Sequence, residues 1–87
     1  MRAIISVIGK DEIGILAKVS GLCAEKKANI VAVTQSVVEG YFSMTMIIQV
    51  EDMTCTIGEL QDLLDERLPE TKNRVMHEDI FYEMHRI

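Results

Sequence analysis

Segment 41–50 constrains the fold most strongly, because apolar and polar residues alternate along almost its whole length. One face carries the large apolar residues Phe42, Met44, Met46, Ile48 and Val50. The other face carries Tyr41, Ser43, Thr45 and Gln49, and Ile47 is the one exception. This period of two predicts a β-strand with one buried face and one mostly polar face. Such a strand is typical of an antiparallel sheet that is covered on one side only.

Three other segments are predicted to be strands. Ile and Val dominate residues 2–8, and segment 29–38 is again rich in β-branched residues. The pair Glu39-Gly40 stands between 29–38 and 41–50, so a tight turn should make these two strands antiparallel neighbours. Residues 72–77 form a shorter and weaker strand.

A first helix is predicted after the polar turn that follows residues 2–8. Its apolar stripe consists of Ile13, Leu16, Val19 and Cys23. Asp11 is the expected N-cap, and Glu12 suits the positive end of the helix dipole. Lys27 should lie near the C-terminus of this helix, where a positive charge is favourable.

A second helix is predicted before the strand at 72–77. Its stripe consists of Ile57, Leu60, Leu63, Leu64 and Leu68. Thr56 and Glu59 have the spacing of a capping box, with Thr54 as the alternative cap. Pro69 should end the helix. The tail from Glu78 to Ile87 has apolar residues at helical spacing and is predicted to form a short C-terminal helix.

The order strand–helix–strand–strand–helix–strand predicts an α+β fold of the ferredoxin-like βαββαβ kind. Its four-stranded antiparallel sheet should carry two helices on one face and leave the other face to solvent or a partner. The 87 residues suffice for a single domain, residues 1–87. A chain this short has a thin core, so we expect a homodimer or a higher homo-oligomer.

Composition excludes several classes of partner. The formal net charge of −5 argues against binding to nucleic acid or to an anionic membrane, and Lys26-Lys27 is only a pair of basic residues. The sequence shows neither a signal peptide nor a stretch long enough to span a membrane. The two cysteines, Cys23 and Cys55, show no pairing motif, so we expect reduced thiols in a cytoplasmic protein.

Catalysis is not predicted. Cys23 lies on the apolar stripe of the first helix and is interpreted as a buried core residue. Cys55 precedes the second helix, where its pKa could be lowered, although a structural role is favoured. His77 and His85 are eight positions apart and lack the spacing of the helical zinc motif, so neither a metal site nor a cofactor is expected.

The most informative segment is Gly9-Lys10-Asp11-Glu12-Ile13-Gly14-Ile15-Leu16. The N–H groups in the first turn of the predicted helix lack partners within the helix, and together with the helix dipole they can hold a carboxylate. In the alternative interpretation, Asp11 caps these groups itself and Gly14 only allows the helix to pack closely on the sheet.

The pattern Asp11-x-x-Gly14-Ile15-Leu16, followed by Asn29-Ile30, resembles the ACT domain family. The start of the chain and the ending Ile80-Phe81-x-x-Met84-x-x-Ile87 look more specifically like the small stand-alone ACT proteins of bacteria and archaea. Many ACT domains have glycine just before the asparagine, whereas this chain has Ala28. A left-handed backbone at that position would be unfavourable for alanine.

The resemblance implies a regulatory module that binds an amino acid or a related small metabolite at a subunit interface and modulates a client protein. It implies that the ligand-binding positions are Asp11, Glu12, Ile13, Gly14, Ile15, Leu16, Asn29 and Ile30. Asn29 would offer both a donor and an acceptor to the ends of an amino acid, and we expect it to face the N-terminus of the first helix.

A ligand-independent oligomerisation or docking module is the alternative function, in which methionines such as Met44, Met46, Met53 and Met76 supply adaptable surface contacts. An unrecognised enzyme is the least favoured possibility. It would need a polar cluster around Cys55 or His77.

Overall fold

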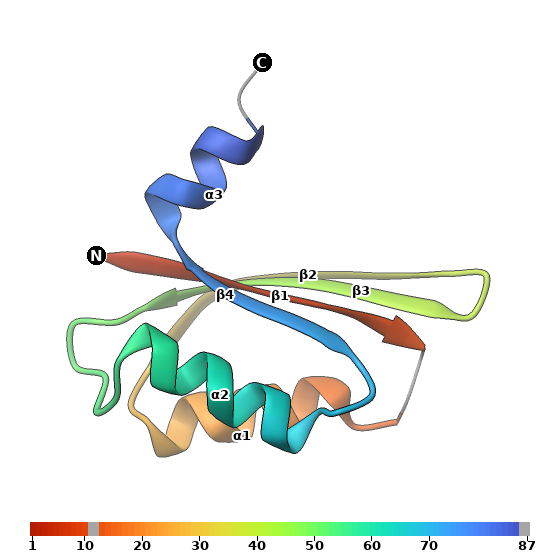
Figure 1. Ribbon diagram of the computed structural model, residues 1–87, viewed down its shortest axis with the longest axis horizontal. Coiled ribbons are helices and arrows are strands. Elements are labelled where there is room, and N and C mark those ends of the chain that lie inside the picture. Colours follow the sequence, from red (N-terminus) through yellow and green to blue (C-terminus); the bar gives the residue numbers. More distant parts are fainter. Residues whose placement is uncertain (11–12, 86–87) are drawn as a thin grey trace.

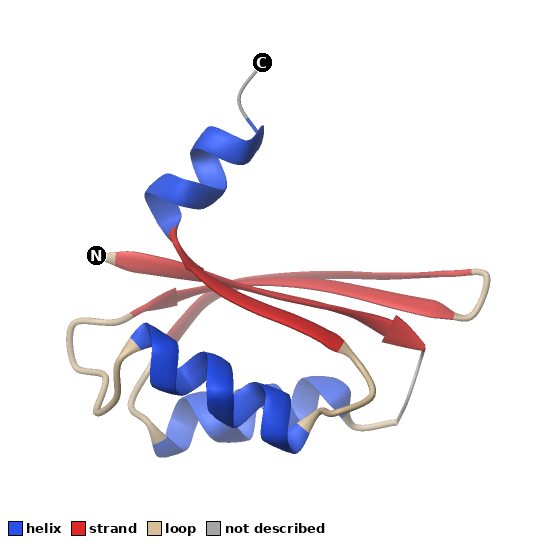
Figure 2. Ribbon diagram, in the orientation of Figure 1, coloured by secondary structure: helices blue, strands red, loops and turns tan. Residues whose placement is uncertain are grey.

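The computed structural model describes residues 1–10 and 13–85. Its elements are β1 (Arg2–Lys10), α1 (Ile15–Glu25), β2 (Asn29–Val38), β3 (Tyr41–Gln49), α2 (Ile57–Arg67), β4 (Lys72–His77) and α3 (Glu78–His85). The strands form one antiparallel sheet in the order β2-β3-β1-β4. Figure 2 shows this sheet in red, with helices on both sides of it. The predicted βαββαβ order, four-stranded sheet and C-terminal helix are therefore confirmed.

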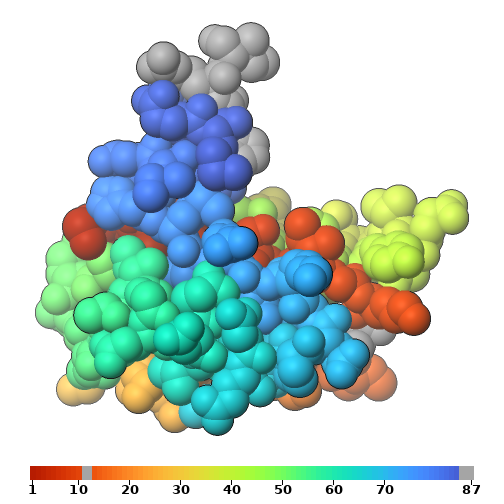
Figure 3. Space-filling view, viewed as in Figure 1, coloured from red at the N-terminus to blue at the C-terminus, as the bar shows by residue number. Residues whose placement is uncertain are grey.

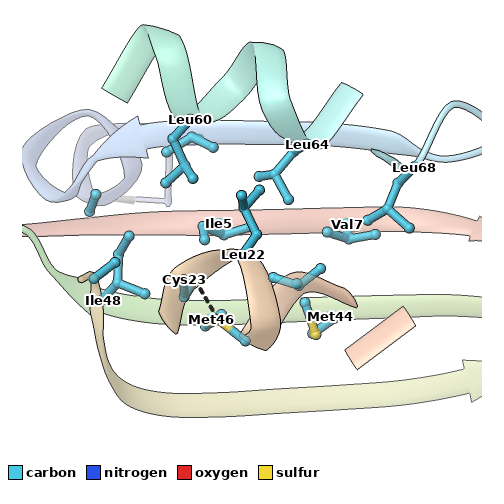
Figure 4. Close-up of a cluster of buried hydrophobic side chains, with 14 of the residues drawn as sticks. Ile5, Val7, Leu22, Cys23, Met44, Met46, Ile48, Leu60, Leu64 and Leu68 are labelled. Carbon is cyan, nitrogen blue, oxygen red and sulfur yellow. Dashed lines mark hydrogen bonds between the residues drawn. The ribbon is translucent and has the colours of Figure 1, made fainter. Parts of the chain in front are cut away.

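The two long helices cover one face of the sheet, and α3 rises on the opposite side (Figure 1). The core lies between the sheet and α1 and α2, as Figure 4 shows. Its most deeply buried large side chains are Ile5, Val7, Ile15, Val19, Leu22, Cys23, Met44, Met46, Ile48, Leu60 and Leu64. The predicted alternation in β3 is confirmed, because Phe42, Met44, Met46 and Ile48 are all buried beneath the helices.

The start of α1 differs from the prediction. The helix begins at Ile15 with Gly14 as its N-cap, so the prediction of Asp11 as the cap is wrong, and Asp11 itself lies outside the described residues. Ile13 precedes the helix and is fully exposed, so it is not part of the core stripe. Gly14 has φ 88° and ψ 8°, a left-handed conformation that strongly favours glycine.

Close packing does not explain Gly14. A Cβ atom built on this residue would meet nothing within 4 Å, so the alternative interpretation of this glycine is wrong. The backbone conformation is the physical reason for glycine at this position.

The C-terminus of α1 explains how Ala28 is tolerated. Lys27, rather than Ala28, has the left-handed backbone, with φ 58°. The Ala28 N–H donates to the Cys23 carbonyl at 2.9 Å, and the Lys27 N–H donates to the Ala24 carbonyl at 3.3 Å. These two bonds form a Schellman motif, in which the residue with positive φ precedes Ala28. Alanine at 28 therefore does not adopt the unfavourable conformation.

The predicted capping box of α2 is confirmed. The Thr56 Oγ1 accepts a hydrogen bond from the Glu59 N–H at 3.0 Å, and a Glu59 carboxylate oxygen accepts from the Thr56 N–H at 2.9 Å. Thr54 is therefore not the cap. The helix ends at Arg67, with Leu68 as the C-cap just before Pro69.

A side chain of α2 covers the outer edge of β4. The Gln61 Nε2 donates to the Asn73 carbonyl at 2.7 Å, and the Gln61 Oε1 accepts from the Val75 N–H at 2.7 Å. The amide thus satisfies one carbonyl and one N–H group that a further strand would use. Buried Asn73 and Thr71 extend this network, because the Thr71 hydroxyl lies 2.6 Å from the Asn73 Oδ1.

Candidate functional site

The candidate site begins at the loop between β1 and α1. Asp11 and Glu12, the first two predicted binding residues, lie outside the described residues. Ile13 is fully exposed, Ile15 is buried in the core, and Leu16 is partly buried beside it. Ile15 and Leu16 therefore anchor the start of α1, while Gly14 presents bare backbone to solvent.

Among the described residues, no side chain caps the N-terminus of α1. Gly14 contributes its carbonyl to the Lys18 N–H at 2.9 Å, but it has no side chain that could cap the first turn. No acidic residue lies in this turn either. The N–H groups at the start of the helix, together with the helix dipole, therefore favour an anionic oxygen such as that of a carboxylate.

Asn29 and Ile30 occupy the start of β2, at the edge of the sheet. Asn29 is exposed, and its Nδ2 donates to the Gln49 Oε1 at 3.1 Å. The side-chain carbonyl oxygen of Asn29 accepts no hydrogen bond from the described residues. Ile30 is 36% exposed although its position in the register, opposite Ile48, is on the helix-covered face.

Within one chain these two parts of the site are far apart. Asn29 pairs with Gln49, which pairs with Arg2 at the start of β1. The loop to α1 instead follows Lys10, at the other end of this nine-residue strand. The separation along β1 is about 27 Å. The expectation that Asn29 faces the N-terminus of α1 in the same chain is therefore wrong.

The sequence predicted β2 but not its exposure. All ten residues of β2 are exposed, including those whose register places them on the helix-covered face. The exposed apolar side chains on this strand include Val31, Val33, Val37 and Val38. Segment 29–38 lacks the alternation seen at 41–50, a pattern typical of a strand covered on both faces, so it gave no signal of exposure in a single subunit.

The two cysteines do not form a reactive site. Burial raises the pKa of the Cys23 thiol to about 11, and the nearby Cys55 adds to this effect. The pKa of Cys55 is also raised, chiefly by burial and then by the negative charge of Glu59. The possibility of a lowered pKa at Cys55 is thus wrong. Neither thiol has the depressed pKa of a cysteine nucleophile.

The described part of the chain contains no cluster of three His, Cys, Asp or Glu residues able to hold a metal ion. His77 uses its Nδ1 to accept a hydrogen bond from the Asp79 N–H at 3.1 Å. No helix among residues 1–10 and 13–85 is long and apolar enough to cross a membrane.

The chain is similar in sequence to known proteins over its whole length. The ACT domain family model matches residues 2–75. A UPF0237 protein of Clostridium perfringens is 41% identical, with all of both chains covered. A UPF0237 protein of Methanocaldococcus jannaschii is 36% identical over 99% of this chain and 98% of the relative.

Solved structures show the same architecture. An ACT domain protein from Streptococcus pneumoniae superposes with a TM-score of 0.76 and 34% identity, covering 93% of each chain. A formyltetrahydrofolate deformylase from Pseudomonas putida has a TM-score of 0.78 over 91% of this chain but only 29% of its own length. Its identity of 13% supports a shared fold alone.

Proposed function

Because the chain belongs to the ACT domain family, we propose that it is a regulatory module rather than an enzyme. It binds an amino acid or a related small metabolite between two subunits and thereby modulates a partner protein. ACT domains are generally regulatory modules that bind small ligands. The two thiols are unpaired in the structure, which supports a reducing, cytoplasmic location.

The two subunits associate through their β2 edges. The β4 edge is already occupied by the amide of Gln61, which bonds to both Asn73 and Val75. The β2 edge carries exposed backbone and exposed valines along ten residues. Pairing of two β2 strands would satisfy these backbone groups and bury the valines. A β-bulge at Val31, between the paired residues Ile30 and Ala32, confines the regular edge to residues 32–38.

A two-fold axis between the β2 strands brings the two parts of the site together. Val38 pairs with Tyr41, which pairs with Lys10, so the end of β2 lies at the same end of the sheet as the loop to α1. Antiparallel pairing over residues 32–38 puts the start of the partner subunit's β2, with Asn29, beyond Val38 at this end of the sheet. The separation of Asn29 and Gly14 within one chain, combined with the open β2 edge, is the observation that carries this proposal.

The chemistry of this composite site suits a small amino acid. The ligand carboxylate accepts hydrogen bonds from the backbone at the start of α1, beside Gly14. The side-chain carbonyl of the partner's Asn29 accepts a hydrogen bond from the ligand ammonium group. Ile13 and the partner's Ile30 line the site, and Asp11 and Glu12 are further proposed contacts from their position in the sequence. A ligand that bridges two subunits would regulate by stabilising one assembly over another.

A thermal-shift screen against the common amino acids tests this function. A ligand at about a hundred times its dissociation constant adds roughly 2.7 kcal/mol, a rise of about 10 °C or more for a domain of this size. Asn29→Ala and Gly14→Val should each remove the shift. Gly21→Ala, at an exposed position in the middle of the same helix, is the matched control and should keep it.

A flat screen in a protein that sediments as a dimer would reject ligand sensing and leave the second candidate, a ligand-independent assembly module. The exposed β2 edge favours that candidate independently of any ligand. Two of the methionines that it invoked, Met44 and Met46, are buried and take no part in such a surface. The apolar contacts would come from the β2 valines instead.

A further inference from the structure

The face of the sheet opposite α1 and α2 is largely uncovered within one subunit. On this face, Tyr41 of β3 pairs with Val38 of β2 on one side and with Lys10 of β1 on the other. Ile8 of β1 and Ser43 of β3 form the next pair on the same face. Ile8 is 50% exposed, Tyr41 58% and Val38 65%. These three side chains form an apolar patch at the end of the sheet away from α3. We call this side of the sheet the open face.

The helix α3 stands on the open side but does not lie along it. It projects away from the sheet in Figure 1 and stands out from the body of the molecule in Figure 3. A bond of 2.7 Å from the Arg2 Nε to Glu78 fastens its first turn to β1. Ile80 and Met84, one helical turn apart, are 56% and 65% exposed. An apolar stripe of this kind is normally covered where a helix packs against a partner.

The charges of α3 and of the open face are complementary. The segment 78–85 contains Glu78, Asp79 and Glu83 but no Lys or Arg. The open face carries Lys72 and Arg74 on β4, both exposed, and no ion pair of the described residues includes either of them. The Asp79 side chain is 86% exposed.

These complementary charges cannot meet within one chain. The strand β4 runs from Lys72 to His77, and α3 follows at Glu78 with no residue between them. The helix therefore extends beyond the end of β4, whereas Lys72 and Arg74 lie back along the strand. Folding α3 onto them would break the β4–α3 junction and the Arg2–Glu78 bond. A second copy of the chain meets neither obstacle.

We propose that two copies of this chain pack open face to open face, with α3 of each subunit lying over Lys72 and Arg74 of the other. The contact is symmetric, so each subunit contributes both an acidic helix and a basic strand. Ile80 and Met84 are buried against the patch of Ile8, Tyr41 and Val38 of the second copy. Apart from Val38, which belongs to both, this surface is separate from the β2 edge. The proposal therefore goes beyond the ligand-binding function and does not depend on it.

The apolar part of the contact is tested with the double variant I80D/M84D. Both residues are more than half exposed in the single subunit, so the melting temperature of the isolated fold should be unaffected. The mass measured by light scattering should fall to half that of the wild type, whether or not the β2 edges also pair. The control A17D places an acid on an exposed position of α1 and should keep the wild-type mass.

The charged part of the contact is tested by reversing the charge at Arg74 or at Asp79. R74E and D79K each create like-charge repulsion in both halves of the symmetric contact, so each should weaken self-association several-fold in low salt. In an equimolar mixture, Asp79 of one variant faces Arg74 of the other, and the two substituted residues face each other with opposite charges. The mixture should regain the wild-type mass, and added salt should weaken this recovery.

Two outcomes would overturn the proposal. One is an I80D/M84D variant whose mass equals that of the wild type. The other is a mixture of R74E and D79K that fails to recover an association lost by both variants. The second result would indicate that Arg74 and Asp79 do not face each other across the contact.

Discussion

The Gln61 side-chain oxygen accepts a hydrogen bond from the Val75 N–H at 2.7 Å, so a helix side chain occupies the outer edge of β4. The same amide donates to the Asn73 carbonyl at 2.7 Å. An edge strand with unpaired backbone groups is a template for pairing with another chain. This contact leaves β2 as the sheet edge that remains open to a partner.

Substituting Gln61 by leucine should therefore destabilise the domain. Q61L leaves the Val75 N–H and the Asn73 carbonyl without their partners, at a cost of about 1–3 kcal/mol for a partly buried donor and acceptor. Urea denaturation measures the difference in unfolding free energy. Asp62→Ala, at the next and exposed position on α2, is the control and should change stability little. Equal stabilities for Q61L and the wild type would show that solvent satisfies this edge equally well.

Gly9 should not tolerate a side chain. A Cβ atom on Gly9 would lie 2.8 Å from the Thr71 Cγ2 and 3.2 Å from the Thr71 Cα. Thr71 cannot easily rotate away, because its hydroxyl bonds to the Leu68 carbonyl at 3.1 Å and to Asn73. Gly9→Ala should lower the unfolding free energy by about 1–3 kcal/mol.

Gly21 is the matched control for Gly9. It lies within α1, and a Cβ atom there would meet nothing within 4 Å. Alanine has a higher helix propensity than glycine, so Gly21→Ala should stabilise the domain by up to about 1 kcal/mol. Thermal and urea melts of the two variants should move in opposite directions. A destabilised Gly21→Ala would contradict this account of the two sites.

Glycine should be favourable at Lys27 and unfavourable at Ala28. The backbone φ of Lys27 is 58°, which glycine adopts without steric cost, so Lys27→Gly should raise the unfolding free energy by about 0.5–1 kcal/mol. Ala28 is buried and does not have a positive φ, so Ala28→Gly should lower stability by a similar amount. Urea unfolding of both variants checks the assignment of the left-handed residue, which a gain at Ala28 would contradict.

Alkaline pH should weaken the fold through Cys23. Burial raises the native pKa of this thiol from 9.0 to about 11, so the native state retains a proton that the unfolded state loses. The stabilising contribution is complete below pH 9 and is lost as the pH rises towards 11. It amounts to about 2–3 kcal/mol at most.

Cys23→Ala provides the comparison for this pH dependence. It removes the titrating group, so the stability difference between the wild type and this variant should be constant below pH 9 and should shrink above it. The measurement is urea unfolding of both proteins across this range. A difference that stays constant up to pH 11 would show that Cys23 does not couple to folding.

Local patterns predicted the element types and several of their details. The alternation around Met44 and Met46 identified the buried face of β3, because a strand's side chains point to opposite sides by geometry. Thr56 and Glu59 identified the start of α2, because the capping box involves only residues three positions apart. The prediction for α1 failed at its start, because Asp11 matched the local capping preference whereas the helix begins after Gly14, whose left-handed backbone the pattern did not reveal.

The sequence by itself determined the order of strands and helices, the face of β3 that is buried, and the family resemblance carried by Gly14 and Asn29. Only the tertiary structure decided that these two residues lie at opposite ends of the sheet, that Gln61 covers one sheet edge and that β2 forms the other. The physical reason is the distance along the chain over which each effect acts. Propensity, periodicity and capping act over a few residues, whereas strand order and register place residues that are far apart in the chain.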